Sequence, residues 1–242
     1  MLAQALQHVM QRLAAAASDA GRPEPRLLAV SKTQPATAIA ELAAVWRARN
    51  GGGIQGPPNG VVAFGENYVQ EALAKQAELA ALTLEWHMIG HLQSNKAHDA
   101  AIAFDWVQTV DRAKLVTALA RHRPPQREAL NVLIQVNIDD ERSKHGCDPE
   151  QVDALAQAIL AEPRLRLRGL MAIPAPHPEQ ALRRAAFARM RGLFDALREA
   201  HPQVDTLSMG MSDDIELAVA EGATMVRVGT ALFGARTVAG SR

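Results

Sequence analysis

Lys32 is the residue whose type and position are best suited to covalent chemistry. It follows the apolar run Leu27-Leu28-Ala29-Val30, and Pro35 ends the extended segment, so we expect this lysine at the end of a buried β-strand. Burial disfavours the ammonium form and leaves more of the free amine, which attacks a carbonyl to form a Schiff base. The alternative is a lysine that extends from a strand end into solvent.

Two glycine-containing turns are predicted to bind phosphate. Each lies between a predicted strand and a predicted helix: Ser208-Met209-Gly210-Met211-Ser212-Asp213 and Arg227-Val228-Gly229-Thr230. Glycine permits close approach of the backbone, hydroxyl groups donate hydrogen bonds, and a helix N-terminus offers free N–H groups. The alternative is that both are tight turns, with Ser212 or Asp213 as a helix cap and Glu216 as its reciprocal partner.

A lysine amine opposite a phosphate-binding turn matches pyridoxal 5′-phosphate. The aldehyde of this cofactor would form a Schiff base with Lys32, and its phosphate would lie against the two turns. We expect Arg227 to contact the pyridine nitrogen, where an arginine, unlike a carboxylate, leaves the ring a weak electron sink. The sequence leaves open that Arg227 binds the phosphate instead, or pairs with Asp213 or Asp214.

The other chemistry-bearing residues are weaker candidates. His87 and His91 are four residues apart, but a zinc site needs a third protein ligand and the segment resembles a strand followed by a loop, so no metal site is expected. Cys147 has no evident activating neighbour, and the charged loop at 141–145 is expected to be a solvated rim. No residue is assigned as a catalytic acid or base.

Eight strands, each followed by a helical pattern, are predicted to position these residues. The strands span residues 27–32, 61–64, 84–90, 104–110, 131–138, 165–172, 204–208 and 224–228. An amphipathic helix over 2–18 precedes them, and a helix is expected over 213–222. We expect Asp111 to cap one helix and Asp148-Pro149-Glu150-Gln151 to begin another, with Leu160 and Leu182 among the side chains that face the core.

This alternation predicts an α/β fold: a single (β/α)8 TIM barrel over residues 1–242, with an extra N-terminal helix. A doubly wound open sheet is the alternative, because the number of strands does not prove that a sheet closes. In a barrel the C-terminal ends of all strands face one mouth. That mouth would gather Lys32, Asn67, Ser208 and Arg227.

The composition is that of a globular protein with no large charge imbalance. Lysine and arginine balance aspartate and glutamate, for a formal net charge of +0, which argues against a general nucleic-acid or membrane-surface binder. One cysteine excludes an intrachain disulfide framework. Polar residues interrupt the N-terminal apolar segment, so we expect no signal peptide, no membrane span and a cytoplasmic protein.

Seven segments closely resemble, in order, the pyridoxal phosphate homeostasis protein family. They are AVSKT at 29–33, FGENYVQE at 64–71, WHMIGHLQSNK at 86–96, VNIDDERSKHG at 136–146, LRGLMAIP at 167–174, LSMGMSDD at 207–214 and MVRVGTALFGAR at 225–236. The resemblance implies a barrel like the N-terminal domain of alanine racemase. It also implies pyridoxal phosphate on Lys32 and a role in binding and buffering the cofactor.

The resemblance further implies which side chains meet the cofactor. Phosphate contacts would fall on Ser208, Ser212, Gly229 and Thr230, and Asn67 would lie close to the ring. With Lys32 and the two turn residues Gly210 and Arg227, these form the candidate cofactor-binding set. The glycine-rich segment at 50–60 is longer than expected for the family, and we expect it away from the mouth.

Three functions are consistent with these residues. The first is a monomeric carrier without turnover, which buffers pyridoxal phosphate and passes it to apo-enzymes that use this cofactor. The second is an amino-acid racemase, which needs a second acid or base opposite the lysine. Tyr68 is the only tyrosine, the chain ends directly after the barrel, and we therefore favour the carrier. The third is a Schiff-base aldolase that needs no cofactor.

Overall fold

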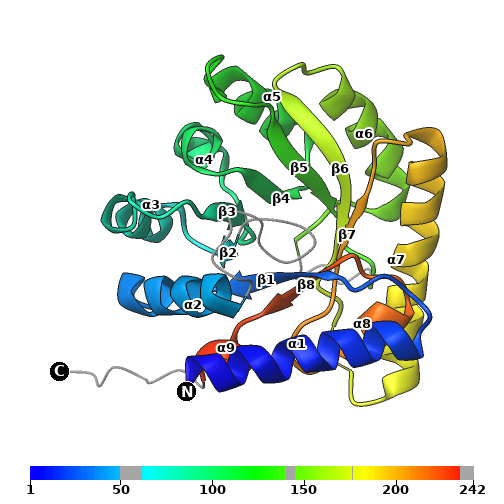
Figure 1. The fold of residues 1–242 in the computed structure, drawn as a ribbon. Coiled ribbons are helices and arrows are strands. Elements are labelled where there is room, and N and C mark those ends of the chain that lie inside the picture. Colours follow the sequence, from blue (N-terminus) through cyan, green and yellow to red (C-terminus); the bar gives the residue numbers. More distant parts are fainter. Residues whose placement is uncertain (50–61, 140–144, 176, 235–242) are drawn as a thin grey trace.

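The computed structural model describes residues 1–49, 62–139, 145–175 and 177–234, and its eight parallel strands close into a barrel (Figure 1). The strands are β1 Arg26–Val30, β2 Ala63–Glu66, β3 Glu85–Met88, β4 Trp106–Val110, β5 Leu130–Gln135, β6 Leu165–Met171, β7 Thr206–Ser208 and β8 Met225–Val228. They follow chain order around the ring, and β8 pairs with β1. The predicted TIM barrel is confirmed, and the open-sheet alternative is wrong.

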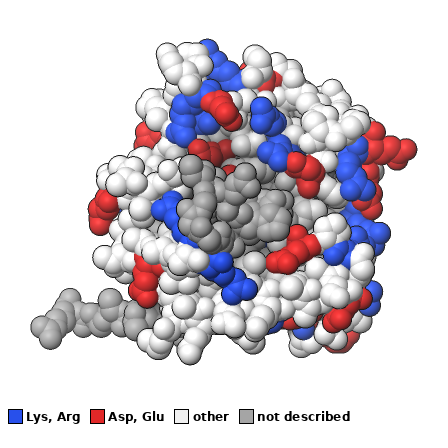
Figure 2. All heavy atoms as spheres, in the orientation of Figure 1, with Lys and Arg blue, Asp and Glu red and all other residues white. Residues whose placement is uncertain are grey.

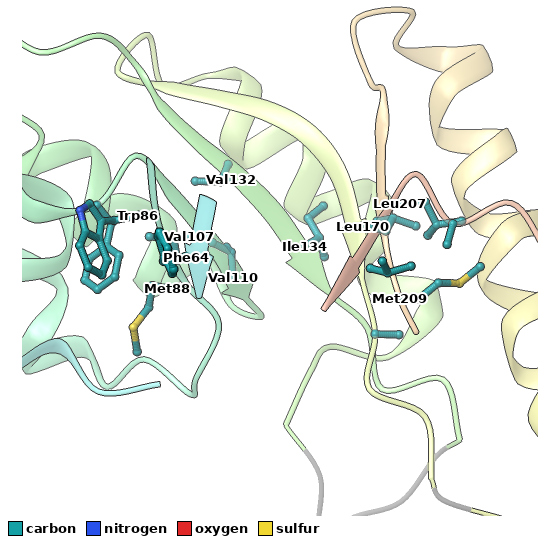
Figure 3. Close-up of a cluster of buried hydrophobic side chains, with 14 of the residues drawn as sticks. Phe64, Trp86, Met88, Val107, Val110, Val132, Ile134, Leu170, Leu207 and Met209 are labelled. Carbon is teal, nitrogen blue, oxygen red and sulfur yellow. The ribbon is translucent and has the colours of Figure 1, made fainter. Parts of the chain in front are cut away.

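Helices surround the barrel because the strands bear apolar side chains on their outer side. The helices are α1 Leu2–Asp19, α2 Ala36–Arg49, α3 Val69–Glu78, α4 Ala97–Ala103, α5 Ala113–His122, α6 Val152–Leu160, α7 Gln180–Ala200, α8 Ile215–Ala220 and α9 Thr230–Phe233, with 3₁₀ turns η1 Ser94–Lys96 and η2 Pro149–Gln151. Outward side chains such as Phe64, Val107 and Ile134 belong to one continuous core cluster (Figure 3). Burial of this apolar surface is the main source of the fold's stability.

The extra N-terminal helix is also confirmed. α1 buries Leu6, Val9 and Leu13 and packs against α2, α8 and α9 (Figure 1). From its exposed side, Arg12 forms a 2.8 Å salt bridge with Glu216 and donates a 3.0 Å hydrogen bond to the carbonyl of Ser212. The helix therefore supports the loop between β7 and α8 from outside the barrel.

The barrel interior contains two small apolar clusters separated by polar side chains. One cluster comprises Leu28, Ala63, Ile89 and Met225, and the other Trp106, Leu133 and Met171. Because side chains alternate between the two faces of a strand, the buried polar residues at corresponding positions also face inward. They include His87, Gln108, Ser208 and Arg227.

The second strand begins and ends later than predicted. Gly65 and Glu66 follow the predicted strand, yet Gly65 lies opposite His87 and Glu66 opposite Met88 in the ladder between β2 and β3. A Cβ atom on Gly65 would lie 2.8 Å from Ile89 Cδ1, so close packing inside the barrel accounts for this glycine. Glu66 is held by a lysine from α3, described below.

Some helix details were predicted correctly and others were not. Asp148 and Gln151 form the expected capping box. Asp111 does not cap α5, whose N-cap is Arg112, and the Asp111 carboxylate instead accepts a hydrogen bond from that arginine. Leu160 and Leu182 are 40% and 48% exposed, because each lies at a helix end that extends past the core.

Two sequence features lie outside the described residues. They are the glycine-rich segment at 50–60 and residues 141–144 of the charged loop. Among the helices that the structure does describe, none combines the length and apolar character needed to cross a membrane.

Candidate functional site

Lys32 lies at the mouth of the barrel, two residues after the end of β1. Leu28 and Val30 belong to the interior apolar cluster, and the alternation of the strand places Lys32 on the same side. The lysine is half-buried, between buried Ser31 and exposed Thr33. Thr33 has φ 64°, and no other non-glycine residue in the described ranges has a positive φ, so the turn after Lys32 is strained.

A buried ion cluster lies directly behind Lys32, between β1, β2 and α3. Lys75 Nζ lies 2.8 Å from the Ser31 carbonyl, 2.7 Å from Glu66 Oε1 and 2.6 Å from Glu71 Oε1. Glu71 also accepts a 2.6 Å hydrogen bond from the backbone N–H of Thr33. The cluster thus binds the backbone on both sides of Lys32, and sequence reasoning missed it.

Arg227 brings a buried positive charge to the mouth from β8. It is 4% exposed and donates hydrogen bonds to two neutral acceptors, Ser208 Oγ and the Ala172 carbonyl, both at 2.8 Å. Burial lowers the pKa of Arg227 to about 10, against a raising effect of the Asp214 charge. Within the described ranges it forms no salt bridge, so the pairing with Asp213 or Asp214 that the sequence left open is not found.

The first predicted phosphate turn follows β7 and touches Arg227. The backbone N–H of Arg227 donates a 3.1 Å hydrogen bond to the Gly210 carbonyl. Gly210 has φ 90°, and a Cβ atom there would lie 2.5 Å from the Cβ of Ala218, so the turn requires glycine. Ser208 is fully buried beneath Arg227, and its hydroxyl donates a 2.7 Å hydrogen bond to Gln108.

The proposed capping of this turn is wrong. α8 begins at Ile215, and its N-cap is Asp214, without a side-chain capping bond. Asp214 instead accepts a 2.6 Å hydrogen bond from the backbone N–H of Met211, inside the turn. Glu216, expected as the reciprocal partner, is paired with Arg12 of α1. The side chain of Ser212 is half-buried at this turn.

The second predicted phosphate turn lies against the end of β1. A Cβ atom on Gly229 would lie 3.4 Å from Val30 Cβ, which places this turn beside the residues that lead to Lys32. Thr230 is exposed and begins α9. The first N–H groups of a helix have no partner within it and are available to an anion.

Asn67 reaches the same end of the barrel from β2. It is half-buried, and its backbone lies so close to Gly90 that a Cβ atom on that glycine would meet the Asn67 carbonyl at 2.2 Å. The candidate residues thus come from β1, β2, β7 and β8, which are consecutive around the ring. Lys32, Arg227 and both glycine turns share one mouth.

The histidines, the cysteine and the tyrosine that the sequence singled out lie in different environments. His87 is fully buried in the barrel, whereas His91 is exposed and its ring stacks on His145 at 3.7 Å. Over the described ranges, no group of three or more His, Cys, Asp or Glu side chains could hold a metal ion. Cys147 is buried, and burial raises its pKa to about 12. Tyr68 is 62% exposed.

The charges on the visible surface are mixed in sign. Figure 2 shows lysine and arginine side chains interspersed with aspartate and glutamate over the face in view, as the balanced composition requires.

Comparisons with known proteins agree with this geometry. The family model "Alanine racemase, N-terminal domain" matches residues 3–237. The chain is 52% identical over 237 residues to the pyridoxal phosphate homeostasis protein of Pseudomonas aeruginosa, covering 97% of this chain and 96% of the relative. It is 49% identical over 240 residues to the protein of the same name from Escherichia coli, covering 97% of both.

Solved structures give the same relationship. PipY of Synechococcus elongatus, with pyridoxal phosphate bound, has a TM-score of 0.79 and 37% identity, covering 97% of this chain and 100% of that one. An alanine racemase of Clostridium difficile shares the fold, with a TM-score of 0.70 and 14% identity. The match covers 95% of this chain and 57% of the racemase.

Proposed function

Because this chain belongs to the pyridoxal phosphate homeostasis protein family, we propose that it binds pyridoxal 5′-phosphate at the barrel mouth and buffers it in the cell. The cofactor supplies an aldehyde that reacts reversibly with amines. Lys32 is the residue that would hold it, since its side chain is half-buried on the interior side of the ring. The PipY structure with bound pyridoxal phosphate supports this proposal.

The buried guanidinium of Arg227 carries the proposal. A guanidinium has five N–H donors, and the two bonds described above leave donors for a ligand. Burying this charge against neutral acceptors is costly unless a ligand compensates it. The pyridine nitrogen and the phosphate of the cofactor are both suitable electron-rich partners. We favour the nitrogen because Arg227 is buried in the interior of the barrel.

The remaining candidates divide between phosphate and ring. We propose that the turn containing Gly210 and Ser212, and the turn containing Gly229 and Thr230, bind the phosphate through backbone N–H and hydroxyl groups. Their glycines permit the close approach that a phosphate needs, most clearly at Gly210. Asn67 directly follows β2, the strand next to β1, and we propose that it lies beside the ring of the cofactor. Ser208 would contribute to cofactor binding indirectly, through its hydrogen bond with Arg227.

A carrier role without turnover fits the side chains better than racemisation does. Racemisation through two bases needs a second acid or base opposite the lysine. Tyr68, the single tyrosine of the chain, is 62% exposed after β2. We therefore propose that the protein passes the cofactor to apo-enzymes and does not turn over a substrate. We also propose that it acts as a monomer in the cytoplasm. Incubation of loaded protein with an apo-transaminase should restore transaminase activity, whereas chiral analysis of added alanine should show no racemisation.

The visible absorption spectrum of the purified protein tests the binding proposal. Wild-type protein mixed with pyridoxal phosphate should show a yellow band that remains after gel filtration, because the cofactor is held by Lys32. The Lys32→Ala variant should lose the band, and Lys114→Ala, which removes an exposed lysine of α5, should keep it. A wild-type protein that stays colourless would refute the proposed function.

A further inference from the structure

A chain of hydrogen bonds crosses the barrel interior beneath Arg227. Arg227 Nη1 donates to Ser208 Oγ at 2.8 Å, and Ser208 Oγ donates to Gln108 Oε1 at 2.7 Å. Gln108 Nε2 lies 2.8 Å from His87 Nδ1. His87 Nε2 lies 2.5 Å from Glu85 Oε1. Ser208, Gln108 and His87 each have 0% exposure, so bulk solvent does not reach any of them.

The bonding partners fix the direction of every link. Arg227 can only donate, so the Ser208 hydroxyl accepts from it and gives its own proton to the amide oxygen of Gln108. The amide nitrogen then donates to His87 Nδ1, which must be unprotonated. His87 consequently carries its proton on Nε2 and donates it to the Glu85 carboxylate.

A flipped amide gives a poorer set of bonds. The Gln108 oxygen would then face His87 Nδ1, which would need a proton, and a neutral ring would turn an Nε2 lone pair toward Glu85. Burial lowers the pKa of His87 against the raising effect of Glu85, which favours a neutral ring. The orientation derived above is therefore the one compatible with a neutral imidazole.

Packing holds the middle of the chain in place. The His87 ring stacks on Trp106 with a centroid distance of 5.1 Å and an interplanar angle of 8°. The guanidinium of Arg168 lies 4.7 Å from the Trp106 ring centroid, on the side of the barrel opposite the mouth. Arg26 ends the chain there with a 2.5 Å salt bridge to Glu85. The imidazole of His87 cannot rotate or exchange hydrogen-bond partners without disturbing its stacking on Trp106 and its bond to Glu85.

We propose that Gln108 and His87 are positioning residues for the cofactor, acting through Ser208 and Arg227. This inference rests on the proposed binding of pyridoxal phosphate at the mouth. An apolar core would be less costly than a row of buried polar groups, so a polar row needs a purpose. Here the bond from the Ser208 hydroxyl to Gln108 turns a lone pair of Ser208 Oγ toward Arg227. The hydrogen-bonded chain thereby fixes the orientation of the guanidinium that would face the ligand.

Substitution of Gln108 tests the proposal through the spectrum of the bound cofactor. Gln108→Met keeps the volume but removes the acceptor of Ser208 and the donor to His87. We expect a shifted visible band and a dissociation constant for pyridoxal phosphate roughly tenfold higher, the effect of weakening one buried hydrogen bond to a charged group. The yellow colour itself should remain, since Lys32 is intact.

A second variant and a matched control separate positioning from general destabilisation. Gln108→Glu is isosteric and places a carboxylate against His87 Nδ1, so it should also shift the band. Thr109→Val removes a buried hydrogen bond of the same strand, to the Gly90 carbonyl, that lies outside the chain. It should lower the unfolding free energy without moving the band or changing the dissociation constant.

Nitrogen NMR of the imidazole tests the direction of the chain in the wild-type protein. We expect His87 to be neutral with its proton on Nε2, and to become doubly protonated in Gln108→Glu. A proton on Nδ1 in the wild type would overturn the inference. The inference would also be overturned if the wild type is yellow and both Gln108 variants have the same visible band and the same dissociation constant for pyridoxal phosphate as the wild type. A colourless wild type would instead refute the proposed function itself.

Discussion

The ammonium of Lys75 donates a 2.8 Å hydrogen bond to the carbonyl of Ser31, the residue that precedes Lys32. Lys75 is 6% exposed and comes from α3, on the outer side of the barrel. With Glu71 bound to the Thr33 N–H, it fixes the backbone on each side of the candidate cofactor lysine. A buried lysine of α3 thus fixes the backbone that carries the half-buried Lys32.

Loss of Lys75 should destabilise the protein strongly. Lys75→Met leaves Glu66 and Glu71 without their cation, and Glu66 Oε2 already has no hydrogen-bond partner among the described residues. Removal of one member of a buried ion pair costs about 3–5 kcal/mol. Urea unfolding should show a loss of this size, whereas Lys114→Met, at an exposed position, should change stability by under about 0.5 kcal/mol. A loss below about 1 kcal/mol for Lys75→Met would contradict this account.

Glu85 should make stability depend on pH in the acid range. Burial raises the pKa of its carboxyl, but the charge that His87 carries when it is protonated in acid, the hydrogen bond from His87 and the charge of Arg26 together outweigh this and lower the pKa from 4.5 to about 2. Since the folded pKa lies below the unfolded one, the stabilisation is complete above pH 4.5 and is lost as the pH falls toward 2. The loss should reach about 3 kcal/mol at most.

Urea midpoints between pH 6 and pH 2 measure this dependence. Glu85→Gln keeps an acceptor for His87 but no longer titrates, so its midpoint should fall less steeply over the same interval. Asp99→Asn, at a partly exposed carboxylate of α4, is the control and should retain the wild-type slope. Equal slopes for wild type and Glu85→Gln would show that Glu85 does not carry the effect.

The barrel was predictable because its signals are local and repeated. Eight apolar runs alternate with helical patterns, and each can be read within a short window. The place of Lys32 followed from its position at the C-terminal end of the first apolar run, which faces the mouth of a barrel. The capping box at Asp148 and Gln151 spans only four residues and was also recognised.

The supporting interactions were not predictable, because they join residues far apart in the sequence. Lys75 and Glu71 are four apart, which suggests only a helix-surface pair, yet the Ser31 carbonyl that Lys75 binds is 44 residues away. Gln108 and Ser208 are separated by 100 residues. Polar residues within a strand give no sign of which buried partner they meet, so the sequence did not reveal the bonds of His87 to Gln108 and Glu85.

Cys147 should be unreactive in the folded protein. Burial raises the pKa of its thiol to about 12, so almost no thiolate forms at pH 8. Labelling with a thiol-specific reagent at pH 8 should be slow in native protein and fast and stoichiometric in guanidinium chloride. The single cysteine of the chain makes the assignment unambiguous. Rapid labelling of native protein would show that the site opens without global unfolding.

Gly210 and Gly192 should respond to alanine in opposite directions. At Gly210 the backbone has φ 90° and a Cβ atom would lie 2.5 Å from the Cβ of Ala218, so Gly210→Ala must distort the turn after β7. We expect a loss of about 2 kcal/mol or more from strain and overpacking, together with weaker binding of pyridoxal phosphate. Gly192 lies exposed within α7, and its Cβ would have nothing within 4 Å.

Gly192→Ala is therefore the matched control, with the same chemical change at a site without crowding. Alanine is preferred to glycine inside a helix by about 0.5–1 kcal/mol, so this variant should be more stable than the wild type and bind the cofactor unchanged. Urea unfolding and titration with pyridoxal phosphate would measure both effects. If Gly210→Ala bound the cofactor as tightly as Gly192→Ala, the turn after β7 would not be part of the binding site, and the phosphate would have to be held by the turn at Gly229 and Thr230.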